Sequence, residues 1–467
     1  MRIFLTSAVL ATSILSANAI NLISRRDGQA PRVVEHPIQR RHVEDPLQHD
    51  RLRRRQSDTV NVKLRNELTL YFMSLSVGTP PQPMEMHIDT GSSDMWVNTP
   101  DSAICQRRGD LCDQAGVFDA NSSSTYQYLN SDFNISYVDG SSSSGDYVTD
   151  VVSFGGLDLR EQQFGIGYTS SSQEGIIGIG YPINEVAVSY GYDQYANIPA
   201  KLKEDGHINT NAYSLWLNDL EASTGSILFG GVNSGKYVGE LETLPIIREV
   251  GGVYAEFIIA LTEVGYNGNQ GSIWNGEPVA ALLDSGSSLM YLPDDIAQGI
   301  FSQVGANYVQ SDGAAYVDCD LSTSDRTIDF TFSSPTIRVP LNELVVGVGI
   351  DNNQPVCILG IGSSGTSTPV LGDTFLRSAY VVYDIDNNEI SLAQTDFNST
   401  QNNIIEISGN SVPSATKVQG AVTNVAAVSD VGISVGGGSS SGVAAPTAAA
   451  GYNLALIGAA GAALLAL

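Results

Sequence analysis

The feature that most constrains the fold of this chain is a six-residue motif that occurs twice. Residues 88–93 read Ile-Asp-Thr-Gly-Ser-Ser, and residues 283–288 read Leu-Asp-Ser-Gly-Ser-Ser. In each copy an aspartate follows apolar residues and precedes small turn-forming residues, a pattern typical of a buried strand that ends in a sharp turn. The repetition predicts a duplicated unit in which a pseudo-two-fold axis brings Asp89 and Asp284 together.

A second element follows each copy at almost the same distance. Residues 176–178 read Ile-Ile-Gly and residues 370–372 read Val-Leu-Gly. Their glycines lie 89 residues after Asp89 and 88 residues after Asp284. Asp, Thr, Ser and Gly also form ordinary turns, so one copy alone would be a weak signal. The matched spacing favours a paired site over two unrelated structural turns.

Paired aspartates predict a specific chemistry. Two carboxyl groups at hydrogen-bonding distance do not both ionise easily, so one holds a proton while the other stays charged. The charged group can take a proton from a water molecule while the protonated group donates to a substrate carbonyl. Such a pair hydrolyses a bond by general acid–base catalysis without a covalent intermediate.

Several motifs around these residues resemble those of the pepsin-like aspartic proteases. They are Val-Gly-Thr-Pro-Pro-Gln at residues 77–82, Asp-Thr-Gly-Ser-Ser-Asp-Met-Trp-Val at residues 89–97, and Leu-Gly-Asp-Thr-Phe-Leu-Arg at residues 371–377. Residues 212–217 and 225–231 are most similar to the fungal yapsins and related enzymes with a glycosylphosphatidylinositol (GPI) anchor. The resemblance covers about residues 66–396 and implies a mainly β, bilobal pepsin-like fold, with two pseudo-symmetric lobes and the active-site cleft between them.

The resemblance also assigns roles to individual residues. It implies that Asp89 and Asp284 are catalytic, that Thr90 and Ser285 brace the two loops, and that Ser92 and Ser287 hydrogen-bond the outer carboxylate oxygens, with Gly91 and Gly286 completing the turns. Residues 133–141 are expected to form the flap over bound peptide. Its residues are Tyr137, Asp139 and Gly140, with Trp96 as the partner of Tyr137.

The N-terminal region indicates secretion and processing. An apolar run at residues 3–15 precedes small residues at 17–19, which is typical of a signal peptide. Residues 20–55 carry nine arginines, no lysine and five acids, and end in three arginines. We expect a basic pro-segment that is cleaved after Arg55 and is held electrostatically on an acidic body, with a solvated basic loop as the alternative.

The sequence of residues 56–400 predicts short strands that are separated by turn residues. Apolar or alternating runs occur at residues 69–77, 84–88, 147–154, 226–229, 253–261, 327–332 and 379–383, and residues 294–304 are the best candidate for a helix. About 340 residues exceed what one core usually holds, so two lobes are expected. Four cysteines allow three pairings; the family arrangement implies Cys105 with Cys112 and Cys319 with Cys357, and the spacing does not favour metal binding.

The C-terminal region changes composition. Beyond Phe397 the chain becomes rich in Ser, Gly, Val and Ala, and residues 454–467 are apolar or small without charge. This layout favours a GPI-attachment signal, with attachment among residues 438–442, over a transmembrane anchor. Three sequons place candidate glycosylation sites at Asn121, Asn134 and Asn398.

The predicted domains follow from these signals. They are a signal peptide (1–19), a pro-segment (20–55), an N-terminal lobe (56–245), a C-terminal lobe (246–400), a stalk (401–453) and a tail (454–467).

The predicted function is an aspartic endopeptidase at the cell surface or cell wall. Its partners would be extended polypeptide substrates, its own pro-segment and a GPI lipid, with no cofactor, metal or nucleic acid, and the chain would be a monomer. Removing residues 1–55, which carry ten arginines and five acids, changes the formal charge from −27 to −32, and this acidic body favours basic substrates and acidic working conditions. A Ser-His-Asp hydrolase is disfavoured because only His87 and His207 remain outside the pro-segment. A catalytically silent binding or structural protein on the same scaffold is the alternative.

Overall fold

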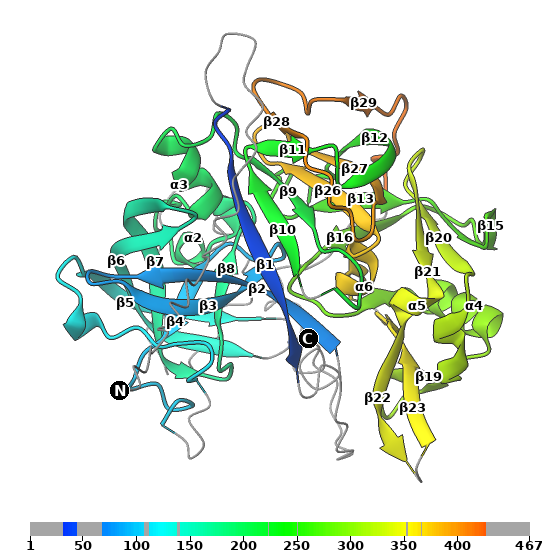
Figure 1. Cartoon of the computed structure of the whole chain (residues 1–467), viewed down its shortest axis with the longest axis horizontal. Coiled ribbons are helices and arrows are strands. Elements are labelled where there is room, and N and C mark those ends of the chain that lie inside the picture. The colour runs from blue at the N-terminus through cyan, green and yellow to red at the C-terminus, as the bar shows by residue number, and fades with distance from the viewer. Residues whose placement is uncertain are drawn as a thin grey trace, which may run out of the picture.

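Figure 1 shows a computed structural model of the chain, which describes residues 31–43, 68–106, 112–137, 141–222, 224–249, 251–351, 354–365 and 367–425. The expected signal peptide, the arginine run at 53–55, the flap residues Asp139 and Gly140, and the apolar tail lie outside the described residues.

The expected mainly β fold is confirmed. The first half contains β2 (Leu68–Val77), β3 (Gln82–Asp89), β4 (Met95–Asn98), β5 (Gln127–Ser136), β6 (Ser142–Phe154), β7 (Leu157–Ser170), β8 (Gly175–Gly178), β9 (Ala212–Trp216), β10 (Thr224–Phe229), β11 (Gly231–Asn233) and β12 (Tyr237–Pro245). The second half contains β13 (Ile258–Leu261), β14 (Glu263–Tyr266), β15 (Asn269–Trp274), β16 (Val279–Leu283), β17 (Met290–Leu292), β18 (Asn307–Val309), β19 (Ala314–Val317), β20 (Thr327–Thr331), β21 (Thr336–Pro340), β22 (Val345–Asp351), β23 (Gln354–Leu359), β24 (Ile361–Ser363), β25 (Val370–Leu371), β26 (Ala379–Asp384) and β27 (Glu389–Thr395).

Helices are short, and the longest one described is the one expected from the sequence. It is α4 (Asp294–Val304), which buries Ile296, Ile300 and Phe301 on one face and ends at Gly305 in a left-handed conformation (φ 74°). The others are α2 (Val186–Ser189), α3 (Ile198–Glu204), α5 (Leu341–Leu344), α6 (Asp373–Leu376) and the 3-10 turns η1 (Ala120–Ser122), η2 (Pro182–Asn184) and η3 (Cys319–Thr323). In the part of the chain that the structure describes, no helix has the length and apolar character needed to span a bilayer.

The two lobes lie side by side and share one long sheet (Figure 1). It includes β1 (Val34–Val43) and β29 (Ala415–Lys417). Its order is β29-β12-β27-β26-β9-β10-β1-β2-β3-β8-β4-β7-β6-β5, and smaller sheets of β13 to β25 form the second lobe. β26 and β27 come from the end of the chain but pair with β9 and β12. The chain therefore does not divide cleanly at residue 245, because these apolar strands are buried within the shared sheet.

Part of the expected pro-segment is a strand within this sheet. β1 (Val34–Val43) lies antiparallel between β2 and β10, with Ile38 opposite both Met73 and Gly225. Ile38 is fully buried, and the Arg41 guanidinium lies 3.2 Å from a carboxylate oxygen of Glu85. This segment is held by backbone pairing and apolar contacts in addition to the charge attraction expected from composition.

The folded body also extends beyond its expected end, so the prediction that the stalk begins at residue 401 is wrong. β28 (Ile404–Glu406) pairs with β11, and β29 (Ala415–Lys417) pairs with β12. The Val418 amide donates to the Thr243 carbonyl over 3.0 Å, and Val418, Ala421, Val422 and Val425 pack on the core. Their apolar side chains give this segment a face to bury, which its small-residue composition concealed.

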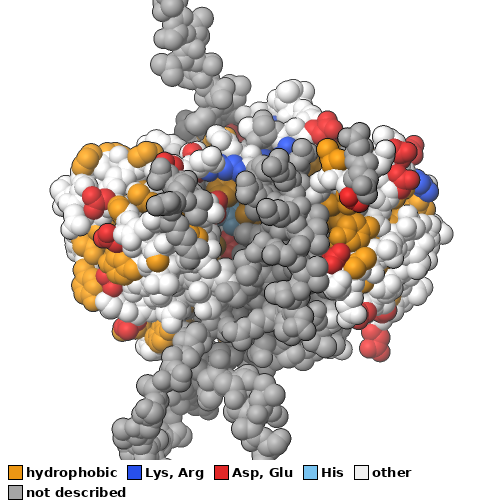
Figure 2. Space-filling view, turned by 90° about the horizontal axis from the view of Figure 1, so that it is seen from below, with side chains coloured by type: hydrophobic (Ala, Val, Ile, Leu, Met, Phe, Trp, Pro, Cys, Tyr) orange, Lys and Arg blue, Asp and Glu red, His pale blue; other side chains and the backbone are white. Residues whose placement is uncertain are grey.

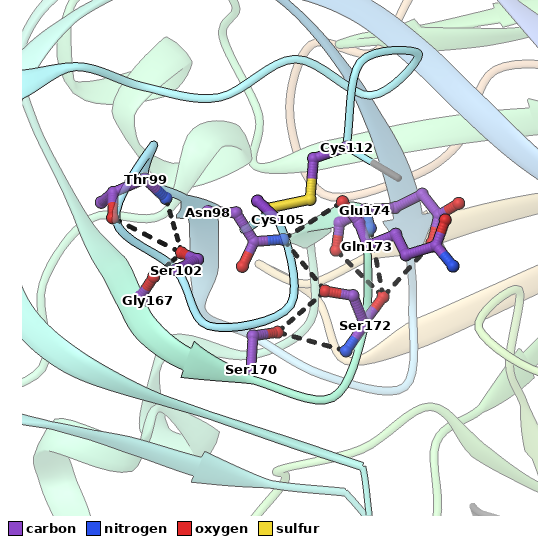
Figure 3. Close-up of a disulfide and its surroundings, with 10 residues drawn as sticks. All are labelled: Asn98, Thr99, Ser102, Cys105, Cys112, Gly167, Ser170, Ser172, Gln173 and Glu174. Atoms are coloured by element: carbon purple, nitrogen blue, oxygen red, sulfur yellow. Dashed lines mark hydrogen bonds between the residues drawn. A yellow bond between two sulfur atoms is a disulfide. The ribbon is translucent and has the colours of Figure 1, made fainter. Parts of the chain in front are cut away.

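Each lobe holds its own disulfide, as the resemblance implies. Cys105 pairs with Cys112, and Cys319 pairs with Cys357. Figure 3 shows the first disulfide beside β4, where the Asn98 side-chain amide donates to the carbonyls of Ser172 and Gln173 over 3.0 and 3.1 Å. The Ser102 hydroxyl donates to the Gly167 carbonyl on β7. The disulfide loop is thus tied to the edge of the strands that follow the first aspartate.

Candidate active site

Asp89 ends β3 and is fixed by its own turn. Its side chain is buried, Oδ1 accepts a hydrogen bond from the Gly91 amide over 2.8 Å, and Oδ2 accepts one from the Ser92 hydroxyl over 2.6 Å. Both contacts orient the carboxyl group in one plane. The small residues of the motif therefore hold the aspartate in a single orientation.

Asp284 follows β16 and repeats this arrangement. Its Oδ1 accepts from the Gly286 amide over 2.8 Å and its Oδ2 from the Ser287 hydroxyl over 2.7 Å. The two copies of the motif form the same local structure, with matching atoms in matching roles. The duplication expected from the sequence therefore reaches the level of individual hydrogen bonds.

The two turns face each other closely. A Cβ atom added to Gly91 would lie 2.5 Å from Oδ1 of Asp284, far inside van der Waals contact. Only glycine leaves room for the second carboxyl group at this position. The structure thus brings the Asp89 turn and the Asp284 side chain into direct contact, as the sequence predicted.

Four hydrogen bonds cross between the two turns. The Thr90 hydroxyl donates to the Leu283 carbonyl over 2.9 Å and accepts from the Ser285 amide over 2.9 Å. Reciprocally, the Ser285 hydroxyl donates to the Ile88 carbonyl over 3.0 Å and accepts from the Thr90 amide over 3.2 Å. Thr90 and Ser285 therefore occupy the bracing positions that the resemblance implied.

Gly178 and Gly372, the glycines that follow the two motifs at matched spacing, lie directly beside the aspartates. β3 and β8 are parallel with Asp89 opposite Gly178, and the Asp284 amide donates to the Leu371 carbonyl over 3.2 Å. A Cβ atom on Gly178 would lie 2.6 Å from the Asp94 amide nitrogen, and one on Gly372 would lie 2.3 Å from the carbonyl oxygens of Ser287 and Leu289. Each glycine makes room for the backbone of the neighbouring aspartate turn, which accounts for the matched spacing.

The expected flap is the hairpin of β5 and β6. Tyr137 follows β5, and its hydroxyl oxygen accepts a hydrogen bond from the indole N–H of Trp96 over 2.7 Å. Both side chains are buried, Trp96 being 1% exposed and Tyr137 7%. The structure therefore brings together the two aromatic residues that the resemblance paired.

Sequence reasoning missed a buried carboxylate beneath the flap. Oδ1 of Asp94 accepts from the hydroxyls of Tyr147 and Tyr195 over 2.7 and 2.9 Å, and Oδ2 accepts from the Val186 amide over 2.8 Å. Burial raises the pKa of Asp94 although these donors oppose the shift. The network ties the turn after Asp89 to the flap strand β6. An acid directly before the apolar residues Met95 to Val97 was the available signal.

A buried histidine is a second residue without a predicted role. His87 lies on β3 two residues before Asp89, and its Nε2 is 3.2 Å from the Ser285 carbonyl oxygen. His87 therefore contacts the turn that carries Asp284. Among the described residues there is no group of three or more His, Cys, Asp or Glu side chains that could hold a metal ion.

The three sequons lie in different environments. Asn121 in η1 and Asn398 after β27 are exposed, whereas Asn134 on β5 is half-buried. Exposure makes the first two more accessible to modification than the third.

Comparisons with known proteins agree with this geometry. The family described as eukaryotic aspartyl protease matches residues 70–395. A probable aspartic-type endopeptidase opsB of Aspergillus fumigatus is 50% identical over 441 residues, covering 92% of this chain and 89% of the relative. Secreted aspartic protease 3 of Candida albicans is 39% identical over 355 residues, covering 74% of this chain and 84% of the relative.

A solved structure shows the same fold at lower sequence identity. The crystal structure of aspartic proteinase from Irpex lacteus superposes with a TM-score of 0.61 at 21% identity. It covers 79% of this chain and all of that protein.

Proposed function

The chain belongs to the eukaryotic aspartyl protease family and is an aspartic-type endopeptidase, and on this premise we propose that Asp89 and Asp284 are its catalytic pair. The observation that carries the proposal is the symmetry of the two turns. Each carboxyl group receives one amide and one serine hydroxyl, and the two loops are braced against each other. Two carboxyl groups held this rigidly are preorganised to act on one water molecule and one carbonyl group.

The proposed reaction is general acid–base hydrolysis of a peptide bond. One carboxylate removes a proton from a water molecule, whose oxygen attacks the peptide carbonyl carbon. The other carboxyl group donates its proton to the carbonyl oxygen, giving a tetrahedral diol. The first carboxyl group then gives the proton that it took from water to the leaving nitrogen, while the second takes a proton back from one hydroxyl of the diol. The carbon–nitrogen bond breaks, and the products are a carboxylic acid and an amine. No covalent bond to the protein forms at any step.

The flap hairpin would close over an extended peptide. A peptide strand would pair with backbone groups at the end of this hairpin, while side-chain pockets would select residues. The hydrogen bond from Trp96 fixes the position of the Tyr137 hydroxyl just after β5. We propose that this contact sets the height of the flap above the cleft.

We further propose that the enzyme works at acidic pH and favours basic residues in its substrates. The chain has 50 acidic and 23 basic residues. Figure 2 shows acidic side chains over both halves of one face and only a few basic ones. A negative surface attracts basic peptides, and its self-repulsion falls as carboxylates become protonated.

The proposed route is secretory, with residues 1–19 as signal peptide and residues 20–55 as pro-segment. β1 supports a pro-segment that is part of the sheet. Cleavage after Arg55 would leave β1 paired with β2 and β10 until it is displaced. Mass spectrometry of the purified enzyme tests this: we expect a cleaved peptide containing residues 34–43 to copurify at neutral pH.

We propose a GPI anchor at the cell surface, with attachment among residues 438–442, and glycans at the sequons. Since the body is folded at least to residue 425, the stalk that separates it from the anchor would be short. Release of the enzyme from intact cells by phosphatidylinositol-specific phospholipase C is the expected result. Retention after this treatment would contradict the anchor.

The experiment that tests the proposed function is a peptide-library digest by the purified full chain between about pH 3 and 7. Asp89→Asn serves as the matched inactive variant because it changes one oxygen to nitrogen. We expect cleavage at acidic pH by the wild type alone, enriched beside lysine or arginine. A folded wild type that cleaves nothing would favour a binding or structural role, and cleavage beside apolar residues alone would contradict the basic preference.

A further inference from the structure

His87 is a polar side chain on the strand that leads to the first candidate catalytic residue. It lies on β3 two residues before Asp89, and side chains two residues apart on a strand project from the same face. Met86 and Ile88 project from the other face and belong to the hydrophobic core. His87 therefore shares the face of β3 that carries the Asp89 carboxyl group.

The imidazole ring of His87 is held by contacts with both halves of the chain. The side chain is 2% exposed, and its ring centre lies 5.6 Å from that of Phe72, the opposite residue on β2. Its Nε2 lies 3.2 Å from the carbonyl oxygen of Ser285. Because a carbonyl oxygen can only accept, Nε2 carries the proton, and it can donate from the neutral and from the charged imidazole. The contact therefore persists in the acidic range in which the enzyme is proposed to work.

The Ser285 carbonyl belongs to the same peptide group as the Gly286 amide. That amide donates to Oδ1 of Asp284 over 2.8 Å. One peptide group thus accepts a hydrogen bond from His87 at its oxygen and donates one to Asp284 from its nitrogen. Hydrogen bonds in such a chain polarise one another, and a charged carboxylate accepts more strongly than a neutral carboxyl group. The contact from His87 therefore favours the charged form of Asp284.

The pseudo-symmetry of the two halves is broken at this position. In the first turn the corresponding peptide group joins Thr90 to Gly91, whose amide donates to Asp89. The residue two positions before the second aspartate, which corresponds to His87, is Leu282. A leucine side chain has no hydrogen-bond donor. The two carboxyl groups therefore have different support behind otherwise matching turns.

The other titratable groups on the neighbouring elements act differently. On β1, the guanidinium group of Arg41 lies 3.2 Å from a carboxylate oxygen of Glu85, so its charge is balanced there. On the side of the second turn, burial raises the pKa of Glu256 and of Tyr383, and the charge of Asp284 adds to both shifts. Glu256 and Tyr383 therefore hold their protons in acid and place no charge beside the pair.

We propose that His87 is a positioning residue, which holds the Ser285–Gly286 peptide group so that its amide keeps the Asp284 carboxyl group oriented and charged in acid. The proposal rests on the proposed function, because it concerns the same pair of aspartates. It requires no contact between His87 and the substrate. Loss of the donor should therefore affect the chemical step and its pH dependence, and leave peptide binding almost unchanged.

The test compares the purified full chain with His87→Leu, which gives the first half the residue that the second half carries at the corresponding position. We expect kcat to fall about tenfold, with KM within about twofold of wild type. The acidic limb of the pH profile of kcat/KM should move to higher pH by about half a unit, because the pair then loses its negative charge at a higher pH.

Two further variants separate positioning from packing. His87→Gln keeps an N–H donor at the end of the side chain and should restore most of kcat and the wild-type acidic limb. Gln162→Leu is the matched control, because the Gln162 side chain is 1% exposed and its amide donates to the Ala196 carbonyl over 2.9 Å. This variant loses a buried donor to a backbone carbonyl and should leave the acidic limb unchanged.

Thermal unfolding shows whether each variant is folded. If His87→Leu does not fold, His87→Phe takes its place, since it keeps an aromatic ring against Phe72 but has no donor. An acidic limb that stays at the wild-type pH without the donor, or that moves equally in His87→Gln, would overturn the assignment. An active wild type with either result overturns this inference alone, whereas a wild type that cleaves no peptide overturns the proposed function and this inference with it.

Discussion

The hydroxyl of Thr90 accepts a hydrogen bond from the backbone amide of Ser285, 195 residues further along the chain, over 2.9 Å. The same hydroxyl donates to the Leu283 carbonyl, so one oxygen atom joins the two aspartate turns. Because each turn fixes its own carboxyl group, joining the turns also fixes the two carboxyl groups relative to each other. The precision of the site depends on this cross-connection.

Replacing Thr90 with valine should impair both stability and catalysis. The change leaves the buried Ser285 amide and Leu283 carbonyl without this partner, at a cost of about 1–3 kcal/mol in the free energy of unfolding. A loosened pair should also lower kcat about 10- to 100-fold. Thr262→Val is a matched control away from the site. The Thr262 hydroxyl likewise donates a hydrogen bond to a backbone carbonyl, that of Thr331, and accepts one from a backbone amide, that of Ser333. Urea unfolding measures the loss of stability, and peptide cleavage kinetics measure the loss of kcat. Equal losses of kcat in Thr90→Val and Thr262→Val would contradict the account.

Trp96→Phe should weaken the flap without unfolding the lobe. The variant keeps an aromatic ring but loses the N–H that donates to Tyr137, so kcat/KM should fall by up to about tenfold. Tyr137→Phe removes the same hydrogen bond, and the double variant should therefore lose less than the sum. Trp216→Phe is the control, because the Trp216 indole N–H has no hydrogen-bond partner among the described residues. Additive losses would show that this hydrogen bond does not couple the two residues.

The buried ion pair of Arg377 and Glu343 should dominate the stability of the second half. Arg377 Nε donates to Glu343 Oε2 over 2.6 Å, and both side chains are 1% exposed. Arg377→Met leaves the buried Glu343 carboxylate unpaired and should lower the free energy of unfolding by about 3–5 kcal/mol. Adding Glu343→Leu should restore part of this free energy, because no unpaired charge is then buried. Lys203→Met, which breaks the more exposed pair with Asp386, should cost less than about 1 kcal/mol. The denaturant concentrations at half-unfolding measure these changes in stability. Similar losses of stability in Arg377→Met and Lys203→Met would contradict the prediction.

Stability should fall as pH rises from about 4 to 7. Burial raises the pKa of Asp384 to about 6, of Glu249 to about 7 and of Glu185 to about 10. Groups with raised pKa bind more protons in the folded state, so their contribution is fully present below the unfolded pKa and is lost as pH rises through the folded pKa. For Asp384 the span of about two pH units corresponds to about 3 kcal/mol. Melting temperatures at pH 4 to 7 test this. In Asp384→Asn the melting temperature should change less with pH than in the wild type. A wild type that is more stable at pH 7 than at pH 4 would contradict the prediction.

Local sequence patterns predicted the site turns because the chemistry there is encoded in adjacent residues. The spacing of Asp89, Gly178, Asp284 and Gly372 reflects direct strand pairing and backbone contact, so it could be identified without a structure. The helix at residues 294–304 was predicted with its observed bounds because its apolar face is periodic.

Features that depend on distant partners were not predictable in this way. β1 and β29 are strands only because β2, β10 and β12 offer edges to pair with, and neither has a strong pattern of its own. Asp94 was overlooked because its burial depends on residues far along the chain. Its neighbours in the sequence are the same whether the carboxyl group is exposed or enclosed.

The central claim is that Asp89 and Asp284 act as one acid–base pair, and the pH dependence of kcat/KM tests it most directly. Measured on one peptide from about pH 2 to 8, the wild type should give a bell-shaped profile in the acidic range. Asp284→Asn, with unchanged thermal unfolding, should lose activity at every pH, because asparagine can neither take nor supply the proton. A folded Asp284→Asn enzyme that retains the wild-type profile would contradict the two-aspartate mechanism.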